Sequence, residues 1–450
     1  METYQDLLKI NDNETERMAF IKRAVQHHQE SAIYKNAYIA QEYDAHRNIT
    51  INKYRKFLYN LSGKAVPDNY SANYKLGSNF FHIFTTQTVQ HLLGNGATWQ
   101  NDDTKNKLGN DFNKQLVNAG KLALTGGESF GFWNFDHLEV FSILEFAPLY
   151  DEDTGALMAG IRFWQVDHTK PFRATLYELD GYTEYIWRDG TASVLAEKAP
   201  YITVISETGM GEKEILDGKN YPSFPIVPLF ANEYKQSTIV GLQEGIDCYD
   251  LIKSGFANDI DDASQIYWIL QNAGGMGNLD LAKFVERIRT VRAVNLDDGV
   301  SAEAHTMEVP YASREAILDR ISKDLYRDAM ALNVQDIISG ATTATQIRAA
   351  YENLDAKCDE FEIRVKDFIR RVLDLTEIDD TPTFTRSYIV NRSEEIQTVV
   401  MAGTFLSSDY VVTKILTLLG DADKADDVKE QLIGDTASRF SVDTGDTSRT

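Results

Sequence analysis

The sequence predicts an α+β protein that is mainly helical and contains one block of antiparallel strands. Residues 4–60 have helical patterns that are rich in charge and tyrosine. Residues 129–228 change to short alternating runs separated by turns, and beyond residue 236 apolar side chains again recur every three or four positions. With 450 residues and 43% hydrophobic content, the chain can form a sizeable core and two or three domains.

Two further helices are expected in the N-terminal half. One covers residues 78–93 and stops at Gly94-Asn95-Gly96, and another lies near residues 103–124 and stops at Gly126-Gly127. Glycine is the usual residue just past a helix end because it adopts the left-handed backbone conformation without strain.

The strand block is predicted from alternation and turn residues. Turns at Leu179-Asp180-Gly181 and Arg188-Asp189-Gly190 separate its runs, which favours hairpins. Residues 221–234 hold three of the nine prolines and predict an extended exit from this block.

A long helix is expected over residues 236–271, followed by a second over residues 313–332 that runs back alongside it. The apolar positions of the second are Ile317, Leu318, Ile321, Leu325 and Met330. Residues 272–312 between them predict a compact insert with a glycine turn, a helix over residues 279–291, and strands near residues 292–296 and 304–310.

Residues 336–354, DIISGATTATQIRAAYENL, pass from a small, polar stretch into a strongly patterned helix. Thr343 and Gln346 have capping-box spacing, so the helix is expected to begin there. It would extend to about Asp374, roughly 47 Å at 1.5 Å per residue. Its apolar seam is Ile347, Tyr351, Leu354, Cys358, Phe361, Val365, Phe368 and Val372. The pattern indicates a mobile loop held on a rigid helix, and an ordinary connector before a core helix is the alternative.

Composition narrows the functional classes. The net charge is −23, opposite in sign to that of proteins that grip nucleic acid through Lys and Arg. Either the protein ignores nucleic acid, or it contacts DNA without holding it. No apolar run approaches a membrane span, and the first residues lack the pattern of a signal peptide. Cys248 and Cys358 are expected to be buried thiols, so the sequence predicts a soluble intracellular protein with no membrane partner.

Several sequence patterns resemble catalytic or ligand-binding motifs, but the elements expected around them do not fit such sites. Asp259, Asp261 and Asp262 point around a helix axis instead of converging on one metal ion. Residues 207–213, ETGMGEK, lack the spacing of a phosphate-binding loop and predict a hairpin turn. Ser129 sits in a G-x-S-x-G pattern, but a helix precedes it and strands follow, the reverse of a nucleophile elbow.

The histidines give no ligand pair, and His27-His28 is expected on a solvated helix. The sequence therefore predicts a protein that is not an enzyme, with no metal and no cofactor.

The order of these elements resembles the portal proteins of long-tailed double-stranded DNA bacteriophages, in the branch common among phages of Gram-positive hosts. The resemblance covers about residues 40–395. It rests on four stretches in order: ANYKLGSNFFHIFTTQTVQHLLGNG, LTGGESFGFWNFD, FPIVPLFANEYKQSTIVGLQEGIDCYDLIKSGFANDIDD and DIISGATTATQIRAAYENLDAKCDEFE.

This resemblance implies the mainly helical portal fold, whose wing carries antiparallel strands. Residues 1–235 would form the wing, 236–271 and 313–332 the two stem helices, and 272–312 a small α/β clip. Residues 333–343 would be the tunnel loop and 344–384 the long wing-spanning helix with its connection. Residues 385–435 would form a helical crown and 436–450 a flexible tail.

The resemblance also implies a role and partners. The chain would be made in the host cytoplasm and form a ring, usually of twelve subunits, at one capsid vertex of the virion. DNA would be packaged and ejected through that ring. The implied partners are the terminase packaging motor, a head-completion or adaptor protein, the major capsid and scaffolding proteins, and double-stranded DNA in weak, sequence-independent contact.

Candidate site residues follow from these assignments. The tunnel-loop candidates are Val334, Gln335, Asp336, Ile337, Ile338, Ser339, Gly340, Ala341, Thr342 and Thr343. The candidate acidic lining of the channel is Glu244, Asp247, Asp250, Asp259, Asp261 and Asp262. The candidates for motor and adaptor docking in the clip are Asn272, Gly274, Gly275, Gly277, Lys283, Glu286, Arg287, Arg289 and Arg292.

The net negative charge of the chain would have a physical role in such a ring. Twelve subunits would carry about −280, and an acidic channel keeps the barrier to sliding low because it does not bind each passing phosphate. Two alternatives remain open: a structural head or tail completion protein that never surrounds DNA, and a metal-dependent nuclease that uses the acidic helix.

Overall fold

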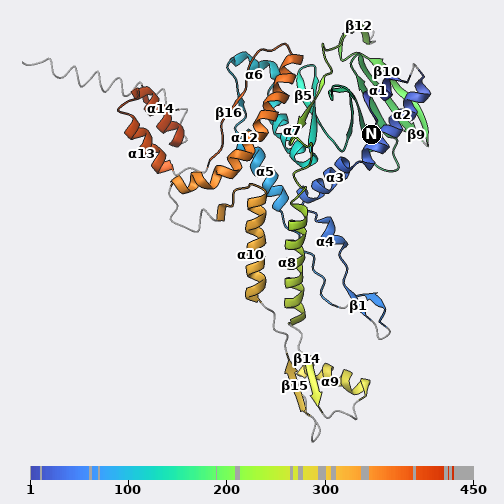
Figure 1. Cartoon of the computed structure of the whole chain (residues 1–450), viewed down its shortest axis with the longest axis vertical. Helices are drawn as coiled ribbons and strands as arrows, with labels where there is room; N and C mark the ends of the chain where they lie inside the picture. The colour runs from blue at the N-terminus through green and yellow to red at the C-terminus, as the bar shows by residue number, and fades with distance from the viewer. Residues whose placement is uncertain are drawn as a thin grey trace, which may run out of the picture. The chain divides into compact units, whose positions relative to one another are not determined.

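The computed structural model describes residues 2–10, 13–59, 63–68, 71–188, 190–207, 213–263, 267–271, 277–291, 301–305, 311–335, 344–388, 392–419, 424 and 428–429 (Figure 1). The chain divides into two compact units. The first comprises Met1–Ala331 with Lys357–Thr385, and the second comprises Leu332–Ala356 with Arg386–Thr450. The described part is mixed helix and strand, as the sequence predicts.

Seven helices are described in the N-terminal part of the first unit. Asn13 and Ser31 cap two of them, each by accepting a backbone N–H bond in the first turn. The seven are α1 Tyr4–Leu8, α2 Glu14–Glu30, α3 Ala32–Asp44, α4 Ile49–Lys53, α5 Phe80–Leu93, α6 Asp102–Leu108 and α7 Phe112–Gly126.

Two expectations for this region are corrected by the structure. The helix expected near residues 103–124 is two helices, because Gly109 has φ +80° and breaks the chain between α6 and α7. His28 is buried rather than solvated, since it shares the inner face of α2 with Phe20 and Val25. Its Nε2 lies 2.7 Å from the carbonyl oxygen of Ile143.

The strand block is antiparallel throughout its described pairs. A five-stranded sheet has the order β10-β9-β8-β7-β6, and a three-stranded sheet has the order β13-β4-β5. The bounds are β4 Glu128–Asn134, β5 His137–Ser142, β6 Phe146–Tyr150, β7 Leu157–Trp164, β8 Phe172–Glu178, β9 Gly181–Arg188, β10 Thr191–Ala199 and β13 Ile226–Phe230. The expected turn at residues 179–181 is confirmed, because Glu178 pairs with Gly181 across it.

Short two-stranded pairs add further strands to the first unit. Glu207 pairs with Lys213, so the ETGMGEK stretch joins the strands of a hairpin, as predicted. The bounds of these strands are β1 Phe57–Tyr59, β2 Ala65–Pro67, β3 Ala97–Thr98, β11 Ile202–Glu207, β12 Lys213–Lys219 and β16 Thr383–Phe384. β1 pairs with β2, β11 with β12, and β16 with β3.

Among the described residues, two hydrophobic clusters join helices of this unit to its other elements. The inner face of α2 packs on the five-stranded sheet, where Phe20 and Ile21 share a buried cluster with Leu149 and Ile161 (Figure 1). A second core joins α3 and α5 to residues 239–246 and to Leu325. Each large apolar side chain that is fully buried stabilises the fold by about 1.5–3 kcal/mol relative to the same side chain left exposed.

The long C-terminal helix is α12, Ala344–Leu375, close to the expected 343–374. Its predicted seam is confirmed from Tyr351 to Val372, where every seam residue is buried. Phe368 lies over Gly131 of β4, so this part of the helix packs on the three-stranded sheet. Ile347 is half-buried, and Thr343 lies outside the described residues.

The helix expected over residues 236–271 is shorter. α8 is Gln243–Ala263, and β14 follows at Tyr267–Gln271. Gly241 has φ +87°, which ends the preceding turn before α8 begins. The run Tyr267-Trp268-Ile269 is aromatic and β-branched, a composition that favours strand over helix.

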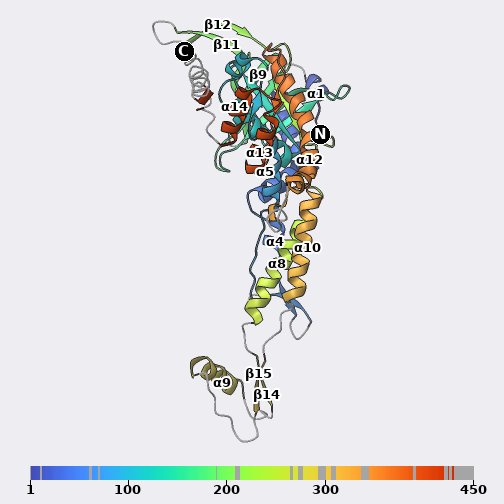
Figure 2. The same ribbon diagram turned by 90° about the vertical axis from the view of Figure 1, so that its left-hand side faces the viewer.

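The return helix is α10, Tyr311–Asp328, and it lies antiparallel beside α8 (Figures 1 and 2). Between them the chain forms α9, Asn278–Val291, and the pair of β14 with β15, Ser301–His305. The helix predicted at residues 279–291 is therefore confirmed, and the strand expected at residues 292–296 lies outside the described residues.

The apolar stripe predicted for α10 is only partly buried. Leu325 is enclosed, whereas Ile317 and Met330 are 48% and 37% exposed. Cys248 is exposed on α8, contrary to expectation, while Cys358 is buried in α12.

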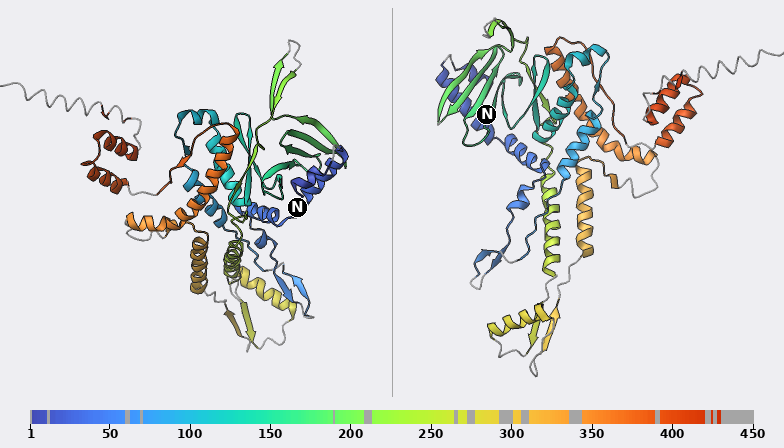
Figure 3. Two further views of the ribbon diagram at one scale, coloured as in Figure 1. Left: turned by 45° about the horizontal axis from the view of Figure 1, so that its top comes forward. Right: turned by 180° about the vertical axis from the view of Figure 1, so that it is seen from behind.

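In the second unit, α13 Arg392–Ala402 is followed by α14 Ser408–Leu419 (Figure 3). Tyr351 and Tyr388 meet edge to face with ring centroids 5.2 Å apart. Among the described residues, no helix is both long and apolar enough to cross a membrane.

Candidate functional site

The acidic helix α8 carries a polar stripe that faces its own chain. Asp247, Asp250, Ser254 and Asn258 follow steps of three, four and four residues, which places them on one side of the helix. Tyr43 of α3, Asn48 at the start of α4 and residues 74–76 before α5 lie against this side.

The two carboxylates of the stripe are held by neighbouring side chains. The Tyr43 hydroxyl donates to Asp247. The Asn48 amide donates to Asp250 with Nδ2 and Oδ2 2.7 Å apart, while the same Asn48 caps α4 through its carbonyl oxygen. Asp250 has no exposed surface, and burial raises the pKa of its carboxyl, opposed by hydrogen bonds from Asn48 and Ser78.

The two neutral members of the stripe hold an extended segment before α5. The Leu76 N–H donates to Ser254 Oγ at 2.9 Å, and the Tyr74 N–H donates to Asn258 Oδ1 at 2.6 Å. These bonds supply backbone partners that an extended segment lacks on its own. Residues 74–76 are thereby fixed along α8.

The remaining candidate lining residues divide by environment. Glu244 and Asp261 are exposed, and Asp259 forms an ion pair with Arg314 of α10. The side chain of Asp262 is outside the described part of the structure. Asp250 is withdrawn as a lining residue, because a carboxylate without exposed surface cannot contribute to a channel wall.

Charge is distributed unequally over the helix pair. α8 contains six acidic residues and one lysine, which gives a net charge of −5, whereas α10 has four basic and four acidic residues and is neutral. Several of the α10 charges pair along the helix, including Arg320 with Asp324 and Lys323 with Asp319.

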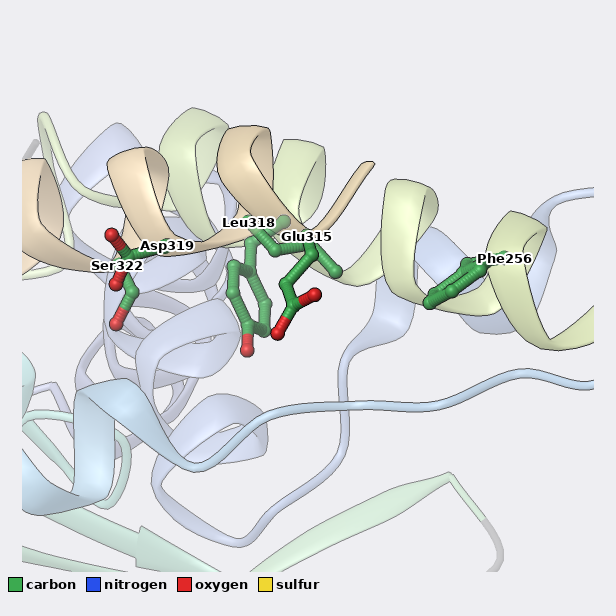
Figure 4. A pocket seen from close by; sticks show the side chains of 6 residues that line it. Phe256, Glu315, Leu318, Asp319 and Ser322 are labelled. Carbon is green, nitrogen blue, oxygen red and sulfur yellow. The ribbon is translucent and has the colours of Figure 1, made fainter. Parts of the chain in front are cut away.

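A groove of about 460 Å³ lies between α8 and α10. Its walls combine two aromatic rings with carboxylates, and Figure 4 shows Glu315 and Asp319 on one helix with Phe256 on the other. The lining residues are Tyr249, Phe256, Glu315, Leu318, Asp319 and Ser322.

The expected docking and loop residues are only partly described. Gly277, Lys283, Glu286 and Arg287 are exposed around α9. The side chain of Arg289 is not described, and Asn272, Gly274, Gly275 and Arg292 lie outside the described residues. In the loop, Val334 is 37% exposed and Gln335 is also exposed, whereas residues 336–343 lie outside the described part.

The apparent catalytic residues occupy structural positions. Ser129 is fully buried in β4, and its hydroxyl donates to the carbonyl of Ala119 at 2.8 Å. That bond ties β4 to α7 and leaves the oxygen without access to a substrate. Among the described residues, no group of three His, Cys, Asp or Glu side chains is placed to hold a metal ion.

Comparison with known proteins places this arrangement of elements in a class. The chain belongs to the phage portal proteins of the SPP1 Gp6-like family, whose model matches residues 21–435. Portal proteins are structural components of the virion that act as the head–tail connector, where DNA enters and leaves the capsid. The chain therefore has a portal function, and its family is structural rather than enzymatic.

Two relatives are similar over most of their length. The portal protein of Clostridium phage phiCD119 is 24% identical over 358 residues, which cover 72% of this chain and 77% of the relative. The portal protein of Bacillus phage SPP1 is 24% identical over 407 residues, which cover 81% of this chain and 77% of the relative.

Similar solved structures come from gene transfer agent particles. A chain in the virion of the native particle has a TM-score of 0.44 and 13% identity, covering 76% of this chain and 90% of that one. A chain in the neck of the native particle, computed with C12 symmetry, has a TM-score of 0.40 and 14% identity, covering 74% and 87%.

Proposed function

We propose that the chain forms a homo-oligomeric ring, of twelve subunits in the virion, with a central channel for DNA. The observation that carries this proposal is the family match over residues 21–435. It is supported by the antiparallel pair of α8 and α10, which leaves Ile317, Leu251 and Ile260 between 43% and 48% exposed. Exposed apolar side chains of this kind on a helix pair are expected to be covered by neighbouring subunits.

Within this ring we assign the parts of the chain as follows. Residues 1–235 form the wing, α8 and α10 the stem, and residues 272–312 the clip. Residues 333–343 form the tunnel loop, and residues 344–384 the wing-spanning helix with its connection. Residues 385–435 form the crown. The partners are the terminase motor and the head-completion protein at the clip, and the capsid and scaffolding proteins around the ring; the subunits are made in the host cytoplasm.

The stem supplies the electrostatic environment of the channel. The net charge of −5 on each α8 repels phosphate instead of binding it, so a duplex slides without being trapped by ion pairs. Glu244 and Asp261 are the exposed candidates for the wall, with Asp259 and Asp262 retained beside them, whereas Asp247 lies on the side of α8 that faces its own chain. At physiological salt the repulsion is screened within about 8 Å, so passage is not blocked.

The tunnel loop is tested by stiffening it. Gly340→Pro fixes φ near −65° and removes a donor, so the loop loses the freedom to follow a duplex whose symmetry differs from that of the ring. Assembled rings with an unchanged melting temperature, together with less packaged DNA per capsid, are expected. As a contrasting variant, lysines at Ala341 and Thr342 add phosphate contacts, and their effect should fade as salt rises. Normal filling of capsids by both variants would make the segment an ordinary connector.

The clip is tested by deletion. Replacing residues 264–310, which include β14 together with the predicted clip up to residue 310, with a short turn should leave the rest of the chain folded, because α8 ends at Ala263 and the antiparallel α10 begins at Tyr311. The variant should form rings that no longer bind the motor or the head-completion protein, measured by co-sedimentation. Packaging at the parent level by this variant would refute the assignment.

A further inference from the structure

A short segment of the first unit has a charge opposite to that of the protein. We name residues 47–77 the basic arm. The arm contains six Lys or Arg residues and one acidic residue, a net charge of +5 in a chain of net charge −23. Lys53 and Arg55 are exposed and make no ion pair among the described residues.

The basic arm also exposes apolar surface. Tyr54, Phe57 and Val66 are 46%, 56% and 37% exposed. Phe57 and Val66 belong to the hairpin of β1 and β2, which pairs with no third strand among the described residues. A two-stranded hairpin is marginally stable alone, so this one is expected to be covered by a partner.

The base of the arm is nevertheless fixed. The Lys56 ammonium donates to the Ala72 carbonyl at 2.7 Å, and the Lys75 ammonium donates to the Asn52 carbonyl at 2.6 Å. The far side of the arm is bonded to α8 through Ser254 and Asn258. A fixed base presents the hairpin in a restricted orientation, which lowers the entropy cost of docking.

The groove between α8 and α10 has complementary chemistry. Its two carboxylates suit the basic residues of the arm, and its rings suit the arm's exposed aromatics. Glu315 is exposed at the groove and has no ion pair among the described residues (Figure 4).

The groove and the arm lie on opposite sides of α8. Positions two residues apart on a helix are separated by about 200° around its axis, so Phe256 points away from both Ser254 and Asn258. A subunit that offers its arm on one side and its groove on the other makes head-to-tail contacts, and contacts of that kind form a ring when the rotation between successive subunits closes.

We propose that the basic arm of one subunit docks into the α8–α10 groove of a second copy of this chain, with Arg55 facing Glu315 and Phe57 meeting Phe256. The proposal rests on the proposed ring and adds the contact that links one stem to the next. DNA would also attract Lys53 and Arg55, but its phosphates provide no apolar surface for Phe57 and Val66. The groove provides both an apolar wall and negative charge.

Intermolecular crosslinking of the full chain tests this contact. In a Cys248→Ser background, chains carrying only Phe57→Cys are mixed with chains carrying only Ser322→Cys, assembled together and treated with a short bismaleimide. The expected product is a covalent dimer that contains one chain of each kind. Arg320→Cys is the matched control, because it lies on α10 about 200° around from Ser322 and should not crosslink.

Charge reversal supplies the second part of the test. Arg55→Glu in the Phe57→Cys chain should remove the crosslink, and adding Glu315→Lys to the Ser322→Cys chain, whose groove receives that arm, should restore it. Sedimentation of each assembly and anisotropy of a labelled duplex are measured in parallel. Rings that form without the crosslink overturn the docking proposal alone. A parent chain that stays monomeric overturns the proposed ring as well. Duplex binding that falls with Arg55→Glu while the crosslink persists assigns the arm to DNA and refutes the proposal.

Discussion

The contact between Phe368 of α12 and Gly131 of β4 allows a quantitative test of the packing that holds the long helix. A Cβ atom added to Gly131 would lie 2.5 Å from Cζ of Phe368, closer than real side-chain contacts, and 3.1 Å from Cδ1 of Leu138. Phe368 is 1% exposed, so its ring cannot move into solvent. Gly131→Ala should therefore cost about 1–3 kcal/mol through overpacking.

Removing the ring has a larger, separate cost. Phe368→Ala deletes a buried ring and leaves a cavity, so it should cost about 3–5 kcal/mol. In the double variant the new methyl group occupies part of that cavity and meets no ring. The combined cost should fall below the sum of the single costs by about 0.5–3 kcal/mol.

Urea unfolding at fixed protein concentration measures these costs. Trp133 is 3% exposed in the same strand, so tryptophan fluorescence reports on this region. Gly255→Ala is the control, because its added Cβ meets no heavy atom within 4 Å inside α8, and it should gain about 0.5–1 kcal/mol. Additive costs for the double variant, or a neutral Gly131→Ala, would refute the packing described.

Three further outcomes are expected. Burial raises the pKa of the Asp250 carboxyl above 3.8. The parent should therefore lose stability relative to Asp250→Asn as the pH rises above 4. A urea midpoint that rises relative to that of the variant over this range would contradict the burial of this group. Burial lowers the pKa of Lys357 to about 8 from 10.5, so the parent should gain stability relative to Lys357→Met between pH 8 and 10.5, and parallel pH curves for the two proteins would count against it. Ser129→Ala should cost about 1 kcal/mol in urea unfolding and leave ring assembly unchanged, because it removes one buried hydrogen bond; a loss of packaging with unchanged stability would point to a chemical role for the hydroxyl.

The elements with strong periodicity were predictable from the sequence. The seam of α12 gave its bounds to within one residue at each end, because Cys358, Phe361 and Val365 repeat at heptad-like spacing. The end of α7 at Gly127 and the hairpin at residues 179–181 followed from glycine chemistry. These signals are local, so no tertiary information was required.

The errors arose where tertiary contacts decide the outcome. The helix expected through residue 271 ends at Ala263, since Tyr267–Gln271 pairs with Ser301–His305 about thirty positions away. The exposure of Cys248 and the burial of His28 depend on which face of each helix meets the core, and the local sequence pattern does not determine that face.

The candidate site was predictable in position but only partly in detail. The acidic character of α8 was evident, yet helical phase alone did not show that Asp250 faces Asn48. The sequence did contain a usable signal, because Asp247, Asp250, Ser254 and Asn258 form a polar stripe of the kind that faces another segment. The basic composition of residues 47–77 is equally visible in the sequence, although the segment begins inside the charged helical pattern of residues 4–60.

The central claim is that the chain assembles into a ring around an open channel. Electron cryomicroscopy of the purified full chain at micromolar concentration tests it most directly, with sedimentation of the same sample across a range of salt. The account predicts closed rings of several hundred kilodaltons with rotational symmetry and a central channel bordered by α8. A uniform 50.8 kDa monomer at every salt concentration, or an assembly without a central opening, would contradict it.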